Sequence, residues 1–180
     1  MGEVKILTLV GSLRAASINR QLAELAAETA PDGVTVNVYE GLGDLPFYNE
    51  DIDNEDAPDS VVALRKAAAE ADAALVVTPE YNGSIPGVLK NAIDWLSRPF
   101  GNGALMGKPA AVIGGSFGRY GGVWAHDETR KSFGLAGPRI VEDLKLSVPF
   151  KSLDGKHPRE NADVAAKLRD IVGKLAAEVA

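Results

Sequence analysis

The stretch "VKILTLVGSLRAASINRQLAELAAETAPDGVTVNVY", Val4–Tyr39, contains one complete β-α-β unit. Its first part, Val4–Val10, is a mostly apolar run rich in β-branched residues, and Thr35–Tyr39 alternates like a second strand. Between them, apolar residues recur at helical spacing over residues 18–30, and Pro31-Asp32-Gly33 supplies a stop. Two strands joined through a helix predict a parallel pair.

The same alternation continues along the rest of the chain. Strands that are apolar on both faces and separated by helices predict a three-layer α/β sandwich around a parallel sheet. No stretch has the composition of a linker, so we expect residues 1–180 to form a single domain. The further elements expected are strands over Ala73–Thr78, Ala110–Gly115 and, more weakly, Ile140–Leu146, and helices over residues 60–71, 87–96, 123–133 and 161–180, the last capped by Asn161.

Composition excludes several classes of function. The net charge of -6 argues against non-specific binding of nucleic acid, which depends on summed basic charge. No long apolar run or leader sequence is present, so we expect no membrane span and a cytoplasmic location. The absence of cysteine excludes disulfides and thiolate chemistry, and two histidines are too few for a histidine-rich metal centre.

Three loops rich in glycine, proline and polar residues follow predicted strands, at residues 11–19, 79–86 and 114–122. The carboxyl ends of parallel strands meet at one edge of the sheet, where ligands of such folds bind. The sequence therefore predicts a binding site built from all three loops.

The first loop has the composition of a phosphate cradle. Gly11 allows a tight turn, Ser12 and Ser17 offer hydroxyl groups, and Arg14 adds a positive charge. The loop lacks both G-x-G-x-x-G and the G-K-[ST] ending of a P-loop, which favours a single terminal monophosphate over a pyrophosphate or nucleoside triphosphate. In the alternative interpretation, Ser17 only caps the helix and Arg14 is solvated.

The second loop, "PEYNGSIP", favours a planar ligand. Pro79 and Pro86 stiffen its ends, Tyr81 offers a flat apolar face, and Gly83 allows a ring to approach closely. An ordinary β-α turn with a surface tyrosine is the alternative.

Three segments together resemble the NADPH-dependent FMN reductases, in particular their quinone and chromate reductase branch. They are "GSLRAASIN", "PEYNGSIPGVLKNAIDWLSRP" and "GKPAAVIGGSFGRYGG". The resemblance implies a flavodoxin-like fold with strand order 2-1-3-4-5, bound FMN, and a homodimer or homotetramer. It also implies which residues contact FMN: Ser12, Arg14, Ser17, Ile18 and Asn19 at the phosphate, and Pro79, Glu80, Tyr81, Asn82, Gly115 and Ser116 at the ring system.

The activity implied by this resemblance is transfer of a hydride from NADPH or NADH, through FMN, to a small acceptor. The acceptors to be expected are quinones, chromate, azo or nitro compounds, and free flavin. The flavin carries the redox chemistry, so no residue is assigned as a catalytic acid or base, and no metal is expected.

Other functions fit parts of the sequence. Residues 114–118 satisfy G-x-S-x-G after a strand, and Ser116, Asp143 and His157 follow in the order of an α/β-hydrolase triad. A flavodoxin-like electron carrier without NAD(P)H activity shares the expected fold, and a non-catalytic FMN-binding module is a third possibility. The hydrolase leaves the first two loops unexplained, so the reductase is the main prediction.

Overall fold

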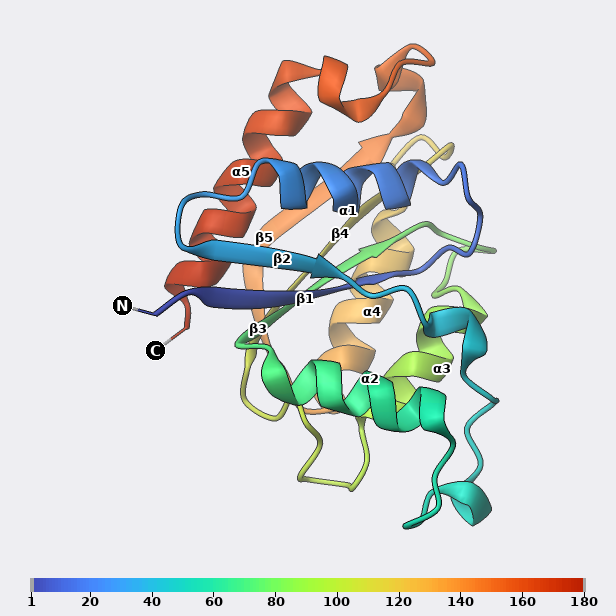
Figure 1. The fold of residues 1–180 in the computed structure, drawn as a ribbon. Coiled ribbons are helices and arrows are strands. Elements are labelled where there is room, and N and C mark those ends of the chain that lie inside the picture. Colours follow the sequence, from blue (N-terminus) through green and yellow to red (C-terminus); the bar gives the residue numbers. More distant parts are fainter. Residues whose placement is uncertain (1, 180) are drawn as a thin grey trace.

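Five parallel strands form one sheet in the computed structural model of the chain, which describes residues 2–179 (Figure 1). The strand order is β2-β1-β3-β4-β5, which is the flavodoxin-like order that the family resemblance implied. The strands are β1 (Val4–Val10), β2 (Val34–Val38), β3 (Ala73–Thr78), β4 (Pro109–Ser116) and β5 (Arg139–Pro149).

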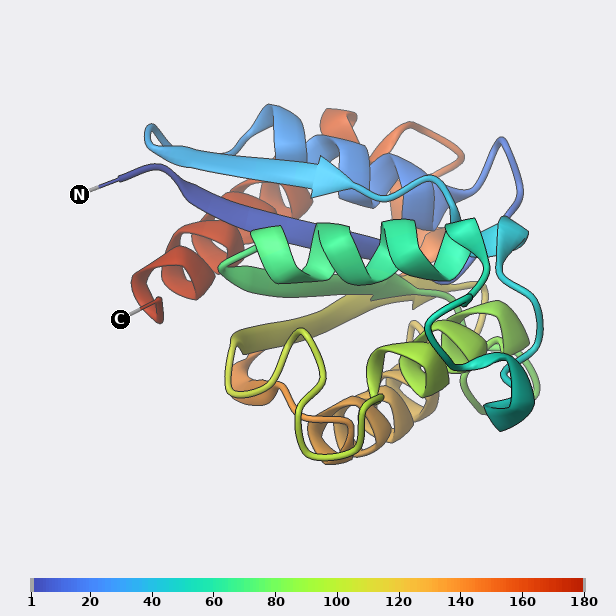
Figure 2. The ribbon, with the colours of Figure 1, turned by 60° about the horizontal axis from the view of Figure 1, so that its bottom comes forward.

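Helices cover both faces of the sheet, as Figure 2 shows. One layer holds α1 (Ile18–Glu28) and α5 (Ala162–Ala177), and the other holds α2 (Asp59–Glu70), α3 (Gly87–Leu96) and α4 (Val123–Leu135). Ser17 caps α1 by accepting from Arg20 N, and Asn161 caps α5 by accepting from Val164 N, as expected. The predicted three-layer sandwich is thus confirmed over the described residues. Ala180, the expected end of the last helix, lies outside them.

Alternate strand residues belong to two different cores. Ile6 and Val10 of β1 pack with α1 and α5, whereas Leu7 and Leu9 pack with α2 and α3. All of β3 is buried, because helices cover both of its faces. Burial on two sides explains why these strands are continuous apolar runs in the sequence.

The edge strand β5 is longer than the predicted Ile140–Leu146 and irregular. Its register slips where it pairs with β4: Ala110 is opposite Ile140, but Val112 is opposite Lys145. The extra residues interrupt the alternation that the sequence pattern would have shown. Beyond the slip, β5 continues to Pro149 and carries Phe150 to the carboxyl edge of β4.

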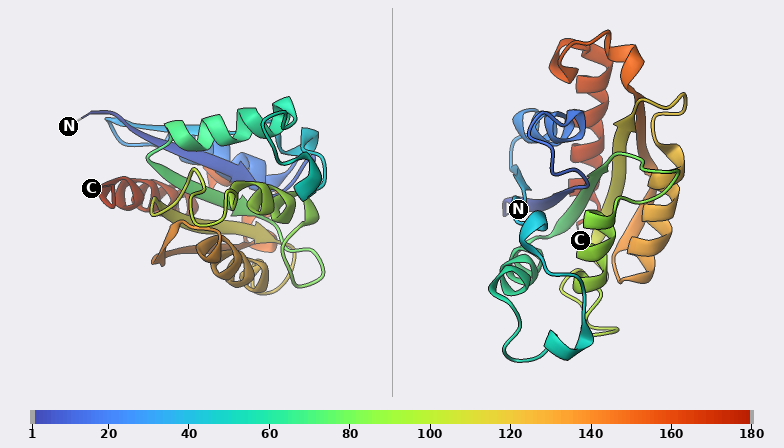
Figure 3. Two further views of the ribbon diagram at one scale, coloured as in Figure 1. Left: turned by 90° about the horizontal axis from the view of Figure 1, so that it is seen from below. Right: turned by 90° about the vertical axis from the view of Figure 1, so that its right-hand side faces the viewer.

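The three predicted loops emerge from the edge of the sheet that faces the viewer in the right panel of Figure 3, while the termini lie together at the opposite edge. At this edge β4 passes very close to its neighbours at Gly114. A Cβ atom there would lie 2.1 Å from Thr78 O and 2.8 Å from both Asn19 Oδ1 and His126 Nε2. Only glycine fits this position without moving backbone atoms.

We predict that Gly114→Ala destabilises the fold by about 3 kcal/mol or more, because the added methyl group overlaps the Thr78 carbonyl. Gly173→Ala in α5 is the matched control, because a Cβ there meets its nearest neighbour, Pro31, at 3.8 Å. That control should stabilise the protein by about 0.5–1 kcal/mol. Urea unfolding of both variants measures the difference, and equal stabilities would contradict the packing described.

Candidate functional site

The three loops enclose one pocket of about 270 Å³ at the carboxyl edge of the sheet. Most of the residues expected from the sequence line it: Ser12, Arg14, Ser17, Ile18, Asn19, Pro79, Glu80, Tyr81 and Ser116. Asn82 and Gly115 are not among its lining residues, although both belong to the same loops. The lining also includes four residues that the sequence did not single out, Ala16, Phe117, Gly118 and Phe150.

The first loop leaves its polar groups free toward the pocket. Ser12 Oγ accepts from Arg14 N and Ser17 Oγ accepts from Arg20 N, each at 3.4 Å, and within residues 2–179 neither hydroxyl donates a hydrogen bond. The exposed Arg14 guanidinium forms no hydrogen bond or ion pair with the same part of the chain. Because Ile18 and Asn19 open α1, their N–H groups have no partner inside the helix. These donors suit an anion.

Asn19 has a different arrangement from the other polar residues of this loop. Its side-chain nitrogen donates to Gly115 O at 3.0 Å, and its side-chain oxygen accepts from Gly115 N at 2.9 Å. The amide is buried and joins the first loop to the third. This bridge shows that Asn19 fixes the relative position of two walls of the pocket.

The second loop is a tight hairpin turn. Tyr81 and Ser84 exchange two backbone hydrogen bonds, and the residues between them, Asn82 and Gly83, have φ values of 54° and 72°. This Asn-Gly pair gives the tight turn its left-handed backbone. The turn places Asn82 at its exposed tip and leaves Tyr81 beside the pocket.

Glu80 connects the second loop to α4. Its Oε2 atom accepts from Ala125 N at 3.1 Å, which satisfies one of the free N–H groups at the start of the helix. The Glu80 carboxylate therefore turns toward α4, and it stabilises the positive end of that helix.

The third loop contributes an apolar wall. The Phe117 ring meets the Phe150 ring edge-on, with 5.1 Å between centroids. Gly115 makes room for this pair, since a Cβ there would lie 2.4 Å from Phe150 Cε1. Phe117 lies inside a loop that the sequence did identify, whereas Phe150 follows an irregular strand and has no motif that could have revealed it.

The residues of the hydrolase alternative do not have the geometry of a catalytic triad. Ser116 Oγ accepts from Gly118 N at 3.2 Å, and no hydrogen bond joins it to a histidine in the described part of the chain. His157 instead caps a short 3-10 helix by accepting from Arg159 N. Ser116, Asp143 and His157 thus do not form a triad.

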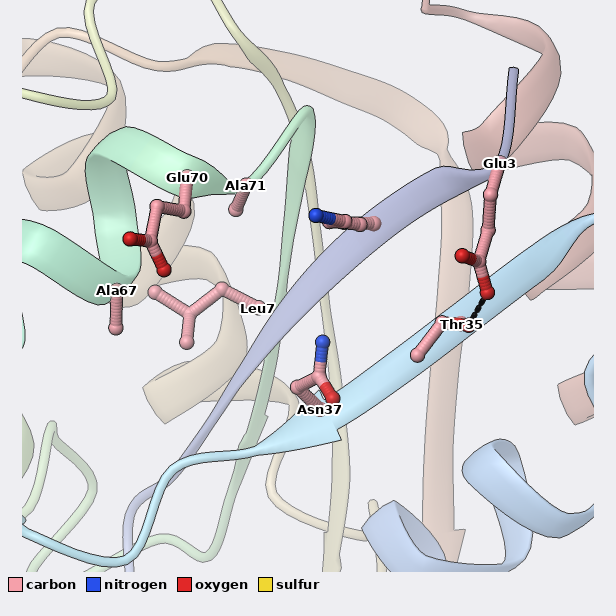
Figure 4. A pocket seen from close by; sticks show the side chains of 8 residues that line it. Glu3, Leu7, Thr35, Asn37, Ala67, Glu70 and Ala71 are labelled. Carbon is pink, nitrogen blue, oxygen red and sulfur yellow. Dashed lines mark hydrogen bonds between the residues drawn. The ribbon is translucent and has the colours of Figure 1, made fainter. Parts of the chain in front are cut away.

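A second hollow, of about 430 Å³, lies beside the edge strand β2 and the end of α2 (Figure 4). Its polar lining includes Glu3, Lys5 and Glu70, and Glu3 accepts a hydrogen bond from the Thr35 hydroxyl. The hollow contains none of the residues of the three loops.

Within the described residues, no group of three or more histidine, aspartate and glutamate side chains could hold a metal ion. No helix in that range is long and apolar enough to cross a membrane.

The fully buried His126 ties α4 to two strands. Its Nε2 atom lies 2.9 Å from Thr78 O, and its Nδ1 atom lies 2.7 Å from Ser147 Oγ. Because a carbonyl oxygen can only accept, the proton is on Nε2, and in the neutral ring Nδ1 accepts from the Ser147 hydroxyl. The sequence interpretation gave His126 no role; an isolated histidine in a helical pattern carries no signal of such a contact.

Burial lowers the pKa of His126 below its ordinary value of about 6.5. The hydrogen bond to Thr78 acts in the opposite direction, the neighbouring Arg130 lowers the pKa further, and the carboxylates of Glu80 and Asp127 raise it. Desolvation is the largest of these effects, so the folded protein holds His126 neutral.

This shift predicts acid sensitivity. The unfolded chain takes up a proton at His126 as the pH falls below about 6.5, whereas the folded chain resists it, so the free energy of unfolding decreases as the pH falls. His126→Gln should be less stable than the wild type at pH 7 by about 1–3 kcal/mol, since buried hydrogen bonds are lost. Between about pH 7 and pH 5 the variant should lose less stability than the wild type, and the difference can reach at most about 2 kcal/mol for an unfolded-state pKa of about 6.5. Urea unfolding at both pH values tests this, and parallel losses in the two proteins would contradict it.

Comparison with known proteins agrees with this architecture. The sequence model of the family described as NADPH-dependent FMN reductase matches residues 4–152. A quinone reductase of Pseudomonas putida is 46% identical over 170 residues, which cover 94% of this chain and 83% of the relative. An NAD(P)H-dependent FMN reductase of Pseudomonas aeruginosa is 42% identical over 72% of this chain and 69% of its own length.

A solved structure of a flavoenzyme has the same fold as this chain. The flavoenzyme NAD(P)H:(acceptor) oxidoreductase FerB from Paracoccus denitrificans superposes with a TM-score of 0.86 at 33% identity, covering 98% of this chain and 97% of that one. The resemblance that the loop motifs suggested is thereby confirmed. The chain belongs to the NADPH-dependent FMN reductase family.

Proposed function

We propose that the pocket between the three loops holds FMN, with its phosphate in the first loop and its ring system between the second and third loops. The observation that carries this proposal is the free state of the first loop's donors. The first loop brings Arg14, two serine hydroxyls and two helix N–H groups to a pocket that is also lined by Tyr81, Phe117 and Phe150. A phosphate monoester on an aromatic ring system has the same distribution of charge and apolar surface.

The residues at the apolar end are suited to one flat ring. Tyr81, Phe117 and Phe150 supply apolar surface, and the stiff Pro79 peptide and the Ser116 hydroxyl supply polar groups at its margin. The Asn19 side chain, which is engaged with Gly115, has a positioning role in this proposal, and the phosphate contact implied by the family resemblance falls to its backbone N–H. Asn82 and Gly115 likewise act through the shape of their loops.

When bound, FMN would supply the hydride and electron-transfer chemistry between NAD(P)H and the acceptor. The protein would contribute binding and orientation: the first loop would neutralise the phosphate, and the bridged second and third loops would hold the ring system. No side chain of the pocket has to exchange a proton with substrate, and we assign none to that task.

Quinones are the acceptor class that the name of the Pseudomonas putida relative supports. The chain's membership of a reductase family argues against the electron carrier without NAD(P)H activity, which remained open from the sequence. We also propose chromate, azo and nitro compounds and free flavin as electron acceptors. The proposed location of the enzyme is the cytoplasm.

A homodimer or homotetramer is part of the same proposal. Two phenylalanine rings, Phe47 and Phe100, are 87% and 85% exposed, and aromatic side chains are enriched where proteins contact one another. The loop over residues 45–51 that carries Phe47 is held to α3, because Pro46 O accepts from Trp95 Nε1 at 2.8 Å. A firmly held loop with an exposed ring suits a contact with a second copy.

Arg14→Ala tests the phosphate contact. A hydrogen bond to a charged group is strong enough that its loss should weaken FMN binding by about ten- to a hundredfold. Riboflavin lacks the phosphate, so its affinity should be the same in the variant and the wild type. Arg14→Lys should recover part of the loss, because an ammonium group keeps the charge without the planar fork. Titration of the flavin-free protein with each ligand measures these affinities.

The matched control is Arg169→Ala, which removes an exposed arginine from α5. It should leave both affinities unchanged. Equal losses of FMN and riboflavin in Arg14→Ala, or no loss of either, would show that Arg14 does not hold the phosphate.

A further inference from the structure

Next to the flavin pocket, the third loop and the start of α4 expose two aromatic rings and one arginine. Tyr120 is 56% and Trp124 is 58% exposed, and their ring centroids lie 6.1 Å apart at an angle of 56°. The guanidinium carbon of Arg119 lies 5.5 Å from the Tyr120 ring centroid. We call these three residues the aromatic shelf.

The shelf continues the pocket outward. Phe117 and Gly118 line the pocket, and Arg119 is the next residue of the same loop. On its other side the shelf approaches the second loop, since a Cβ at Gly83 would lie 3.8 Å from Trp124 Cε3. A ligand that reaches from the flavin ring toward solvent can therefore extend over the shelf.

We propose that the aromatic shelf binds the adenosine 2′-phosphate end of NADPH, with the adenine against Trp124 and Tyr120 and the 2′-phosphate on Arg119. The inference rests on the proposed function, because the nicotinamide end of the same molecule must reach the flavin. It names residues for a donor whose binding surface had no assignment from the sequence.

Charge supports this choice of ligand. The protein has a net charge of -6, yet Arg119 forms no ion pair or hydrogen bond with any carboxylate of residues 2–179. Contact with the Tyr120 face leaves the N–H groups at the guanidinium edge free, and that planar fork matches a phosphate. The other unpaired arginine of this edge, Arg14, lines the pocket and serves the FMN phosphate in the proposal above.

The shelf therefore divides recognition into two parts. Trp124 and Tyr120 contact adenine, which NADPH and NADH share, whereas Arg119 contacts the 2′-phosphate, which only NADPH has. Loss of the Trp124 ring should weaken the binding of both NADPH and NADH, whereas loss of Arg119 should weaken the binding of NADPH alone.

Tryptophan fluorescence can report the contact with adenine directly. The chain has two tryptophans, and Trp95 is fully buried, so a ligand that stacks from solvent quenches Trp124. Adenosine 2′,5′-bisphosphate should quench the fluorescence of the flavin-loaded protein. Trp124→Phe should abolish that quenching but keep the affinity within about threefold, whereas Trp124→Ala should weaken binding by about tenfold, as measured by calorimetry.

The variant Arg119→Ala tests the contact with the 2′-phosphate. Its affinity for adenosine 2′,5′-bisphosphate should fall by about ten- to a hundredfold, while its affinity for adenosine 5′-monophosphate stays unchanged. Arg169→Ala is the control for the removal of one exposed arginine, and it should change neither value.

Steady-state kinetics with a quinone separates this inference from the proposed function. Arg119→Ala should raise KM for NADPH without raising KM for NADH, and reduced nicotinamide mononucleotide, which lacks adenosine, should be used equally by all variants. Equal effects of Arg119→Ala on NADPH and NADH would overturn the inference and leave the proposed function intact. A change of oligomeric state in Trp124→Ala by sedimentation would also overturn it, by making the shelf a contact between copies. A wild type that oxidises none of the three donors would instead refute the proposed function.

Discussion

The close approach of Gly114 to the Thr78 carbonyl is the constraint on which the rest of the carboxyl edge depends. Without a side chain at Gly114, the Asn19 amide and the His126 ring can both lie against the backbone of β4. Asn19 then bridges to Gly115, and His126 connects Thr78 to Ser147 of β5. Loops that are far apart in the sequence are thereby fixed relative to one another through buried hydrogen bonds, which are costly to break.

Polar residues at this edge divide into two groups with different tasks. Asn19, Glu80 and His126 have partners within the protein, and their contacts hold the loops together. Arg14 and Arg119 have no carboxylate partner in the described residues, and the two lie on different loops beside the same pocket. Preorganised walls with free cations are what an enzyme needs when its cofactor carries the chemistry, because binding energy is then not spent on ordering the loops.

Local patterns in the sequence were sufficient for the strands, the helices and the three-layer class of fold, and the family resemblance added the strand order and most of the pocket residues. Apolar runs predicted the strands, and Ser17 and Asn161 predicted two helix caps. The family resemblance of the three loop motifs named nine residues that line the pocket. Long-range geometry could not be predicted. Phe150 reaches the pocket because β5 slips in register, and His126 acts through partners that are 48 and 21 residues away. The engagement of Asn19 with Gly115 is also invisible in the sequence, since a polar residue at a helix start looks the same whether it faces a ligand or another loop.

We propose above that three loops of one sheet edge form a single FMN site that exchanges electrons with NAD(P)H and quinones. The visible absorption spectrum of the purified protein, recorded before and after NADPH and again after a quinone, tests this most directly. We expect the spectrum of an oxidised flavin, released as FMN on denaturation, which NADPH bleaches and the quinone restores. A colourless protein that takes up no added FMN, or bound FMN that NADPH and NADH both leave oxidised, would contradict the account.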